Sequence, residues 1–361
     1  MISRRLAPAA AIGFALLLLS CSEPGHRESS WEVMETTAEA IVYTRVERDA
    51  DASIEEIRHK IDEAASILDP YSETGALGQL NRTASDEFYT FKGVDLFACI
   101  KLALDYGRET EGAYDPTAGV LKRLYATRQA SASPPRPLEI DVALTRVGWE
   151  KVTVEPEAPA MRFRAPGLLL DLGPVGHGCA IDWASRAFAR SGRLGGLIRI
   201  GGTYRAWESP VGQDVWRVAL SDPRGADRQL LSIAVSNRGL AVCGQPEVGE
   251  HSTGAELGRV PPLDPRTGQP VGSDLLAVVT TADSSADAAA LCQALFVAGS
   301  LEGPDIFSRM LRAEAVLLVR SDQGAPYLVA SASLRGRIEL SAELEAETGG
   351  DVRYLLPPDS F

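Results

Sequence analysis

The sequence predicts an α+β fold, in which mixed or antiparallel sheets are combined with helices. Apolar residues recur at helical spacing in some segments and form short strand-like runs in others. The two kinds of segment alternate without the regular β-α-β beat of a parallel α/β protein. Hydrophobic residues make up 45% of the 361 positions, which supports a sizeable core. The length suits one large domain or two moderate ones.

The first 20 residues have the pattern of a lipoprotein signal peptide. Two arginines precede an apolar stretch over residues 7–19, which is too short, and too soon followed by polar residues, to be a good membrane-spanning helix. Ser20 directly precedes Cys21, so we expect Cys21 to carry lipid; an ordinary cleaved signal peptide is the alternative. Residues 21–33 are then a tether, and the protein is an exported lipoprotein of the bacterial cell envelope, facing the periplasm and held to a membrane only by its lipid.

Helices are predicted where apolar residues recur three and four positions apart. In residues 53–68 the repeat includes Ile54, Ile57 and Ile61, with a serine or aspartate near the N-terminal cap. The other helical segments are 94–106, 180–189 and 286–298.

Strands are predicted at short apolar runs bounded by turn residues. These runs are 38–44, 151–154, 167–170, 197–200, 215–220, 230–236, 275–281 and 315–319. Residues 131–137, rich in serine and proline, are the candidate boundary between two lobes, although the sequence does not establish two independent domains.

The charge balance argues against a nucleic-acid partner. The formal net charge is −13, the pI is near 4.9, and no basic stripe is present. Four cysteines follow Cys21, and they are widely spaced, without a Cys-x-x-Cys pair or a zinc-ligand spacing. We expect buried free thiols at positions 99, 179, 243 and 292, although an oxidising periplasm would permit a bridge.

A Gly-rich turn begins at Asp171, between the predicted strand 167–170 and the predicted helix 180–189. A carboxylate at a strand end and free N–H groups at a helix N-terminus together favour an anionic ligand. Such turns are also Gly-rich for steric reasons alone. The order of the glycines does not match the dinucleotide-binding fingerprint.

Several short motifs occur in an order typical of one family. Residues 112–117 read Gly-Ala-Tyr-Asp-Pro-Thr, residues 264–268 read Asp-Pro-Arg-Thr-Gly, and the Asp171 turn lies between them. With the lipoprotein leader, this series resembles the ApbE-like flavin transferases, the FAD:protein FMN transferases. The resemblance implies an ApbE-like fold with two lobes around a flavin cleft. It assigns residues 34–340 to this domain and leaves 341–361 as a C-terminal tail.

The activity that the resemblance implies depends on magnesium. FAD is cleaved at its pyrophosphate, FMN passes to a Thr or Ser hydroxyl of a target protein, and AMP is released. The diphosphate must be held in line with the hydroxyl while its charge is neutralised. Mg²⁺ takes oxygen ligands in octahedral geometry. The implied partners are therefore a flavin nucleotide, Mg²⁺ and a target protein.

The resemblance places flavin contacts at eight positions. These are Met34, Tyr71, Ala113, Tyr114, Asp115, Asp171, His177 and Pro261. Pro174 stands where the family offers a backbone carbonyl to magnesium, which a proline retains. The structural alternative is that Met34 and Tyr71 are core or rim residues and that the two aspartates cap turns.

Several positions depart from the family pattern. The family commonly has lysine, sometimes glutamate, in place of His177, and it has a histidine in place of Pro261. A serine usually stands at Cys243.

The largest departures lie on the metal-binding helix. Aligned without gaps, Ala289 replaces the family's aspartate and Gln293 its threonine, while Cys292 replaces an aspartate found there in some members. A shift of two residues would use Asp287, but residues two apart point about 200° from one another around a helix. No register restores both oxygen ligands, so Asp287 and Gln293 are weak metal candidates. Asp287 has a simpler explanation as an acid near a helix N-terminus.

Three hypotheses follow. The chain is an active FMN transferase with a rebuilt magnesium site, or it is a degenerate family member that binds flavin or a partner protein without FMN transfer. The third, outside the family, is a binding lipoprotein whose Gly-rich turn is only structural.

Overall fold

The computed structural model describes residues 25–130, 133–155, 157–189, 194–208, 214–222, 224, 228–244, 260–310, 313–321 and 325–355. Within them, one large sheet has the strand order β1-β2-β6-β7-β10-β11-β12-β13-β15. Neighbouring strands are antiparallel except for the parallel pair β13 and β15. The strands are β1 (Gly25–Val33), β2 (Thr36–Thr44), β6 (Gly195–Ile200), β7 (Thr203–Glu208), β10 (Arg238–Gly244), β11 (Leu275–Ala282), β12 (Glu314–Val319), β13 (Tyr327–Ser331) and β15 (Val352–Leu355).

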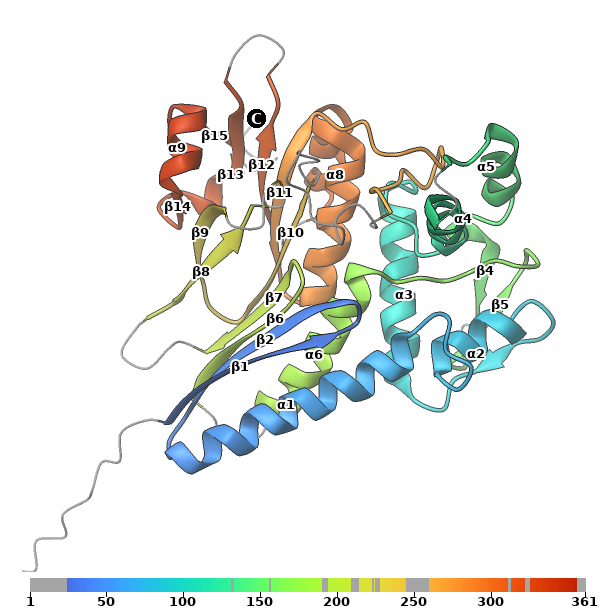
Figure 1. Ribbon diagram of the computed structural model, residues 1–361, viewed down its shortest axis with the longest axis horizontal. Coiled ribbons are helices and arrows are strands. Elements are labelled where there is room, and N and C mark those ends of the chain that lie inside the picture. Colours follow the sequence, from blue (N-terminus) through green and yellow to red (C-terminus); the bar gives the residue numbers. More distant parts are fainter. Residues whose placement is uncertain are drawn as a thin grey trace, which may run out of the picture.

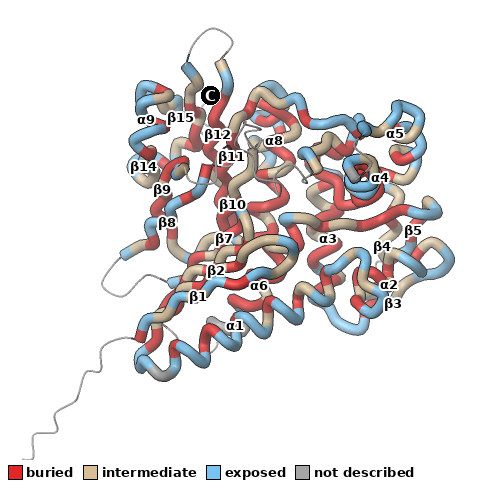
Figure 2. Tube along the Cα trace, in the orientation of Figure 1, coloured by how far each residue is buried: buried red, intermediate tan, exposed pale blue. Residues whose placement is uncertain are grey.

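Helices cover one face of this sheet. They are α1 (Glu47–Leu68), α6 (Pro174–Ala189) and α8 (Ser285–Ser308). The helix α3 (Val94–Glu109) packs against α6 and α8 (Figure 1). The inward faces of these helices form the main core with the sheet, which includes Ile57, Ile181 and Leu291. Buried positions follow the inner side of each helix, whereas the outer side of α1 is exposed (Figure 2).

The opposite face of the sheet is covered by a three-stranded sheet. Its strands are β8 (Trp216–Ser221), β9 (Gln229–Val235) and β14 (Ile338–Leu340). A second core lies between the two sheets and includes Leu231, Ile233 and Leu318. The helix α9 (Ala342–Thr348) and the 3₁₀ turn η2 (Ala332–Leu334) lie beside it. Layers of helix and of antiparallel strand on one sheet confirm the predicted α+β fold.

A smaller group of elements lies on the far side of α3 (Figure 1). It contains α2 (Ala76–Thr83), β3 (Tyr89–Thr90), α4 (Gly119–Ala130), α5 (Pro137–Leu144), η1 (Trp149–Lys151), β4 (Val152–Val154) and β5 (Ala160–Phe163). The helices α4 and α5 share a core of their own, which includes Leu121, Ile140 and Leu169.

The helices predicted at 53–68, 94–106 and 286–298 are confirmed as parts of α1, α3 and α8. The last continues beyond the predicted end because Gly299 produces a kink instead of a terminus. Its φ of 71° and ψ of −174° are non-helical, and the chain resumes a helix after it. Glycine adopts such angles with little strain.

The prediction of a strand at 167–170 is wrong. Only Leu169 forms a β-bridge, to Ala118. The backbone N–H and carbonyl of Leu170 instead bond to the side-chain amide of Asn81, each at 2.9 Å, and the N–H of Asp171 donates to the carbonyl of Pro116. A buried backbone requires such partners, and here a side chain and a loop supply them in place of a neighbouring strand.

The Gly-rich segment is mostly helix, because α6 begins at Pro174 and not near Ala180. Proline suits the first position of a helix, where its missing N–H has no intrahelical role. Gly178 faces the start of α8, and a Cβ there would lie only 2.5 Å from the nitrogen of Ala286. This glycine therefore serves the close packing of two helices.

Both ends of the domain extend beyond the predicted boundaries. Residues 25–33, expected in the tether, form β1 and pair with β2. Residues 342–348 and 352–355, expected in a tail, form α9 and β15. The signal peptide and Cys21 lie outside the described residues. None of the helices in the described part of the chain is long and apolar enough to cross a membrane.

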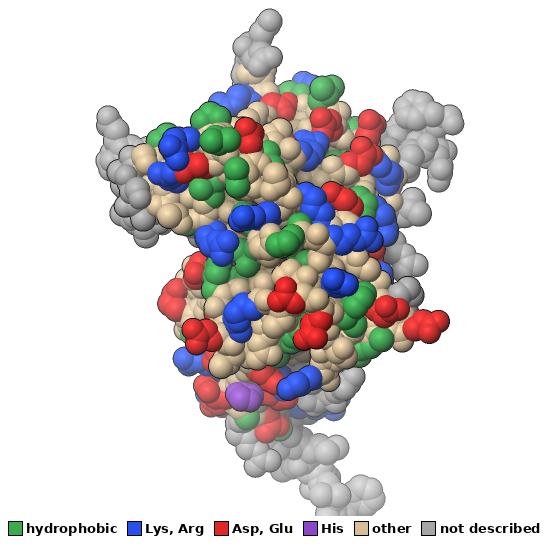
Figure 3. Space-filling view, turned by 90° about the vertical axis from the view of Figure 1, so that its right-hand side faces the viewer, with side chains coloured by type: hydrophobic (Ala, Val, Ile, Leu, Met, Phe, Trp, Pro, Cys, Tyr) green, Lys and Arg blue, Asp and Glu red, His purple; other side chains and the backbone are tan. Residues whose placement is uncertain are grey.

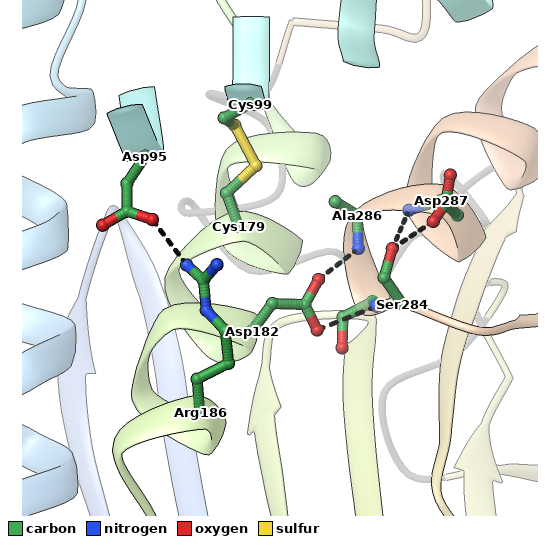
Figure 4. Close-up of a disulfide and its surroundings, with 9 residues drawn as sticks. Asp95, Cys99, Cys179, Asp182, Arg186, Ser284, Ala286 and Asp287 are labelled. Carbon is green, nitrogen blue, oxygen red and sulfur yellow. Dashed lines mark hydrogen bonds and ion pairs between the residues drawn. A yellow bond between two sulfur atoms is a disulfide. The ribbon is translucent and has the colours of Figure 1, made fainter. Parts of the chain in front are cut away.

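The expectation of free thiols is also wrong. Cys99 and Cys179 form a disulfide between α3 and α6 (Figure 4), and Cys243 and Cys292 form another between β10 and α8. The paired residues are 80 and 49 positions apart. Sequence spacing cannot indicate such pairs, because the fold alone brings them together.

Candidate functional site

Two adjoining cavities bring most of the predicted site residues together. The larger has a volume of about 560 Å³, and its predicted lining residues are Met34, Tyr71, Asp171, Pro174, His177, Ala289 and Gln293. The smaller has a volume of about 300 Å³ and is lined by Ala113, Tyr114, Asp115, Pro261 and others. Asp171, Pro174 and Gln293 line both. Another cavity of about 600 Å³ lies beside α1, β3 and α6, but it contains none of the predicted residues.

Asp171 stands at the junction of the two cavities. Its carboxylate oxygen Oδ1 accepts a hydrogen bond from the backbone N–H of Gly173 at 2.9 Å and one from the ammonium of Lys122 at 3.0 Å. Its side chain is 15% exposed, so it remains open to the cavity. The bond to Gly173 is the turn-capping role that aspartate commonly has, and the ion pair with Lys122 adds a charged pair at the cavity surface.

Asp115 has a mainly structural role. One of its oxygens accepts from the N–H and the hydroxyl of Thr117, at 2.8 and 2.6 Å, and the other accepts from the N–H of Trp149 at 2.8 Å. Burial raises the pKa of Asp115, and these hydrogen bonds oppose the rise. The carboxylate therefore fixes the loop before α4, although the residue lines the smaller cavity.

Tyr114 has a buried hydroxyl that lacks a hydrogen-bond partner among the described residues. The residue is 5% exposed and lines the smaller cavity. Burial raises the pKa of this hydroxyl well above its ordinary value, with Asp171 and Asp115 adding to the effect, so it is a neutral donor. Buried polar groups normally find a partner, so this hydroxyl is suited to a ligand or a bound water.

Met34 and Tyr71 border the larger cavity. Met34 lies with Glu35 in the hairpin turn between β1 and β2, where both have positive φ angles of 50° and 61°. Type I′ hairpins need this conformation, which costs non-glycine residues roughly 1–2 kcal/mol each. Tyr71 is 53% exposed, so its ring is accessible at the rim. The strand predicted at 38–44 lies within β2, which begins at Thr36, so Met34 stands in the turn before it.

His177 lies in the wall of the larger cavity, on the first turns of α6. Burial lowers its pKa to about 4, and the nearby ammonium of Lys122 adds to this, while a backbone hydrogen bond with Met34 and the charge of Asp171 act in the opposite direction. At neutral pH the imidazole is uncharged. It therefore supplies a neutral hydrogen-bonding group and no positive charge.

On α8, the positions of the ungapped alignment, Ala289 and Gln293, face the site, and Asp287 does not. Ala289 and Gln293 both line the larger cavity, one helical turn apart. Asp287 lines neither cavity. Its backbone N–H bonds to the side chain of Ser284 at 3.0 Å, its carboxylate bonds to the same hydroxyl, and it also interacts with Tyr106, whose pKa is raised chiefly by burial. Asp287 therefore lies at the N-terminal cap of α8, beside Ser284 (Figure 4).

These residues do not fit the magnesium site that the resemblance implies. The part of the chain that the structure describes has no group of three Asp, Glu, His or Cys that could hold a metal ion. The two α8 positions carry a methyl group and an amide. Pro174 can contribute only its backbone carbonyl. The carboxylate of Asp171 already forms an ion pair with Lys122. Mg²⁺ requires six close oxygen ligands, so the protein would supply few of them.

Two features of the site were not predicted. Lys122 and the Cys243–Cys292 disulfide both line the larger cavity, and Lys122 and Cys243 also line the smaller one. The sequence did contain an indication of Lys122. It is a basic residue within the apolar stretch that follows Gly-Ala-Tyr-Asp-Pro-Thr, and it stands three residues after Gly119. Because residues three apart share a helix face, Lys122 lies on the side where Gly119 approaches Asp171.

Comparisons with known proteins identify relatives of this chain. The FAD:protein FMN transferase of Salmonella typhimurium is 25% identical over 258 residues, which are 70% of this chain and 73% of that protein. The FAD:protein FMN transferase of Vibrio cholerae is 24% identical over 320 residues, 87% of this chain and 94% of that protein.

Solved structures show the same fold. The flavin transferase ApbE from Vibrio cholerae has a TM-score of 0.73 at 21% identity and covers 87% of this chain and 99% of its own. The ApbE protein from Thermotoga maritima has a TM-score of 0.70 at 22% identity, with 89% and 99% covered. The model of the ApbE family matches residues 34–317, which is most of the chain. The protein therefore belongs to the ApbE family.

Proposed function

We propose that this protein binds FAD in the two adjoining cavities and transfers FMN to a Thr or Ser hydroxyl of a target protein. The observation that carries the proposal is the convergence of three distant segments, 113–115, 171–177 and 289–293, on one pair of cavities. Their volumes suit a ligand of nucleotide size. The relatives named FAD:protein FMN transferases support the same conclusion.

Individual side chains suit the parts of FAD. The accessible ring of Tyr71 offers a face on which a planar flavin can stack, and the buried hydroxyl of Tyr114 can donate to a polar atom of the ligand. In the transfer, the target hydroxyl oxygen bonds to the phosphorus of FMN, and the bond from that phosphorus to the bridging oxygen breaks, so that AMP leaves with that oxygen and its electron pair. The hydroxyl proton passes to a base, for which Asp171 is the candidate because its carboxylate lines both cavities.

A second candidate function is flavin-nucleotide binding without transfer. The observation that favours it is the wall formed by α8, where Ala289 and Gln293 face the cavity and Cys292 is held in a disulfide. Without carboxylates, this wall would hold a divalent cation weakly, and such a cation could then do little to bind the phosphates of a nucleotide. Binding and transfer therefore need separate measurements.

The test begins with binding of FAD to the purified protein, measured by calorimetry and by quenching of flavin fluorescence, with and without Mg²⁺. If no FAD binds in either condition, the proposal is wrong. The protein is then incubated with FAD and a domain that carries a family-type flavinylation site. A covalent fluorescent band together with released AMP supports the transferase, and binding without either product supports the second candidate.

We also propose that Cys21 carries the lipid and that the domain faces the periplasm. Two disulfides support this placement, because such bonds persist in oxidising compartments. Expression of the full chain and of Cys21→Ser in a bacterial host, followed by fractionation, tests it. Wild-type protein should sediment with membranes and the variant should not; equal distribution would argue against a lipid anchor.

A further inference from the structure

Lys122 is placed in the site by the packing of α4. That helix begins at Gly119, where a Cβ would lie 2.7 Å from the carbonyl oxygen of Leu169 and 2.9 Å from Cβ of Asp171. Only a glycine lets the helix approach this closely. One turn later, on the same helix face, the ammonium of Lys122 reaches Asp171 at 3.0 Å.

The segment opposite also accommodates the ammonium. Gly173 has a φ of 51°, and a Cβ there would lie 2.9 Å from Nζ of Lys122. Gly173 therefore meets two requirements, a left-handed backbone and room for the lysine. The next residue, Pro174, begins α6, so the ammonium lies at the N-terminal end of that helix, where the backbone dipole also favours an anion.

Among the described lysines and arginines, Lys122 is the one whose side chain lines these two cavities, and it lines both. The neutral His177 adds no charge. On the side of the molecule that carries α4 and α5, basic and acidic side chains are interspersed, and the whole chain has a net charge of −13 (Figure 3). Among the described residues, Lys122 is therefore the side chain that brings a positive charge into the two cavities, and the N-terminal end of α6 adds its dipole.

The ammonium can contact a ligand without leaving Asp171. A lysine side chain has three N–H donors, and the contact with Asp171 uses one of them. The side chain is 36% exposed, so the other donors can reach oxygen atoms inside the cavities. Hydrogen bonds from an ammonium to phosphate are charge-assisted and stronger than neutral ones.

We propose that Lys122 neutralises the diphosphate of the bound nucleotide in place of a magnesium ion, so that this protein binds FAD without a metal. The inference rests on the proposed function, since FAD is taken as the ligand. It joins two observations: the α8 wall lacks oxygen ligands suited to Mg²⁺, and a fixed cation stands at the junction of the same two cavities.

The test compares ligands with and without a diphosphate. Binding of FAD and of riboflavin to the purified protein is measured by calorimetry in EDTA and in Mg²⁺. We expect FAD affinity to be the same in both buffers within about threefold. In EDTA, Lys122→Met should weaken FAD binding roughly 10- to 100-fold, the loss of one or two charge-assisted bonds, while riboflavin binding changes by less than about threefold.

Two further variants control for folding and for charge. Lys122→Gln keeps a donor for Asp171 without the positive charge, and it should lose FAD affinity as Lys122→Met does. Lys101→Met removes a surface lysine that bonds Asp105 at 2.7 Å on α3, far from the cavities, and should leave FAD binding unchanged. Circular dichroism checks that each variant is folded.

The outcomes separate this inference from the proposed function. FAD binding by the wild type only with Mg²⁺, an equal loss for FAD and riboflavin, or unchanged FAD affinity in Lys122→Gln would overturn the role of Lys122 and leave flavin binding intact. If the wild type binds no FAD in either buffer, both proposals are wrong.

Discussion

Cys292 is bonded to Cys243, so a disulfide joins α8 to the end of β10 within the wall of the larger cavity. Cys292 immediately precedes Gln293, which faces the same cavity. Cys243 on β10 and Cys292 on α8 both depart from the family pattern, and a covalent bond joins them. This bond holds the helix against the sheet beside the site.

The double substitution Cys243→Ser with Cys292→Ser should lower the free energy of unfolding by about 2–4 kcal/mol. The physical reason is that a crosslink over 49 residues reduces the conformational freedom of the unfolded chain. Urea denaturation measures the loss, and calorimetry with FAD measures the effect on the site, where affinity should fall.

Cys99→Ser with Cys179→Ser is the matched control. This pair spans 80 residues and lines neither cavity, so it should lose a similar stability and keep its FAD affinity. Equal affinity losses in the two double variants would show that the first disulfide has no special relation to the site.

A magnesium site should form when Ala289→Asp is combined with Gln293→Thr. Both positions face the larger cavity one turn apart, so the new oxygen atoms would lie together beside Pro174 and Asp171. We expect Mg²⁺ affinity to rise by at least about tenfold, measured by calorimetry in the presence of FAD. Gln293→Thr alone adds no carboxylate and should change little. A double variant with wild-type metal affinity would show that this helix register is not the metal-binding one.

The amphipathic helices were predictable because their apolar period is a local property of the sequence. The start of α6 was not, since glycines at 176 and 178 resemble a loop when the facing helix is unknown. The three leucines at 168–170 are buried, as expected, whereas Gly167 is exposed. The backbone of Leu170 bonds to Asn81 and that of Asp171 to Pro116, both distant in sequence, so an apolar run alone suggested the wrong backbone.

The positions that the family motifs mark line the two cavities, so their proximity was predictable, and their role in binding stays a prediction. Lys122 could not be identified in advance, because its importance comes from Asp171, 49 positions away, and from the space at Gly173. Asp287 is the opposite case. Its carboxylate was a metal candidate in the sequence, but in the structure it accepts a hydrogen bond from the hydroxyl of Ser284 at the start of α8.

The stability of the protein should fall in acid through His177. Its pKa is about 4 in the folded protein and 6.5 in the unfolded chain. Above pH 6.5 both states are neutral and the group contributes no pH dependence. As the pH falls from 6.5 to 4 the unfolded chain takes up the proton first, so the free energy of unfolding should decrease by at most about 3 kcal/mol.

Urea denaturation at several pH values, compared between the wild type and His177→Gln, measures this contribution. The variant should be less sensitive to acid over that range. Identical pH profiles would mean that His177 takes up its proton equally well in both states.

Asp182 should be important for the contact between α6 and α8. Its carboxylate, which is 19% exposed, accepts from the backbone N–H groups of Ser285 and Ala286 at 3.0 and 3.1 Å, at the start of α8 (Figure 4). Asp182→Ala would leave two helix N-terminal donors without this acceptor, and we expect a loss of about 2–4 kcal/mol in unfolding free energy. Asp182→Asn retains one acceptor and should lose less.

Asp95→Ala is the control for Asp182. It removes an ion pair with Arg186 in which both side chains are more than half exposed. Such surface pairs contribute little, so urea denaturation should show a change within about 0.5 kcal/mol. A loss for Asp95→Ala as large as that for Asp182→Ala would contradict the assignment of the stability to the Asp182 carboxylate and its bonds to the start of α8.

Residues 341–355 should stabilise the domain through Glu347 on α9. Its carboxylate bonds to Arg224, a side chain only 7% exposed, which also bonds to Asp222, the residue after the end of β8. Arg224 lowers the pKa of Glu347, so this contribution is present at neutral pH and is lost as the pH falls through the folded-state value, below 4.5. We expect Glu347→Gln to lose about 1–2 kcal/mol of unfolding free energy at pH 7, because Glu347 is partly exposed and the charged bonds weaken without vanishing.

The exposed Glu343→Gln on the same helix is the control, and it should change stability by less than about 0.5 kcal/mol. Equal stability of the two variants in urea would show that the bonds between Glu347 and Arg224 add nothing to stability; a loss confined to Glu347→Gln would show that these bonds fasten α9 to the rest of the domain.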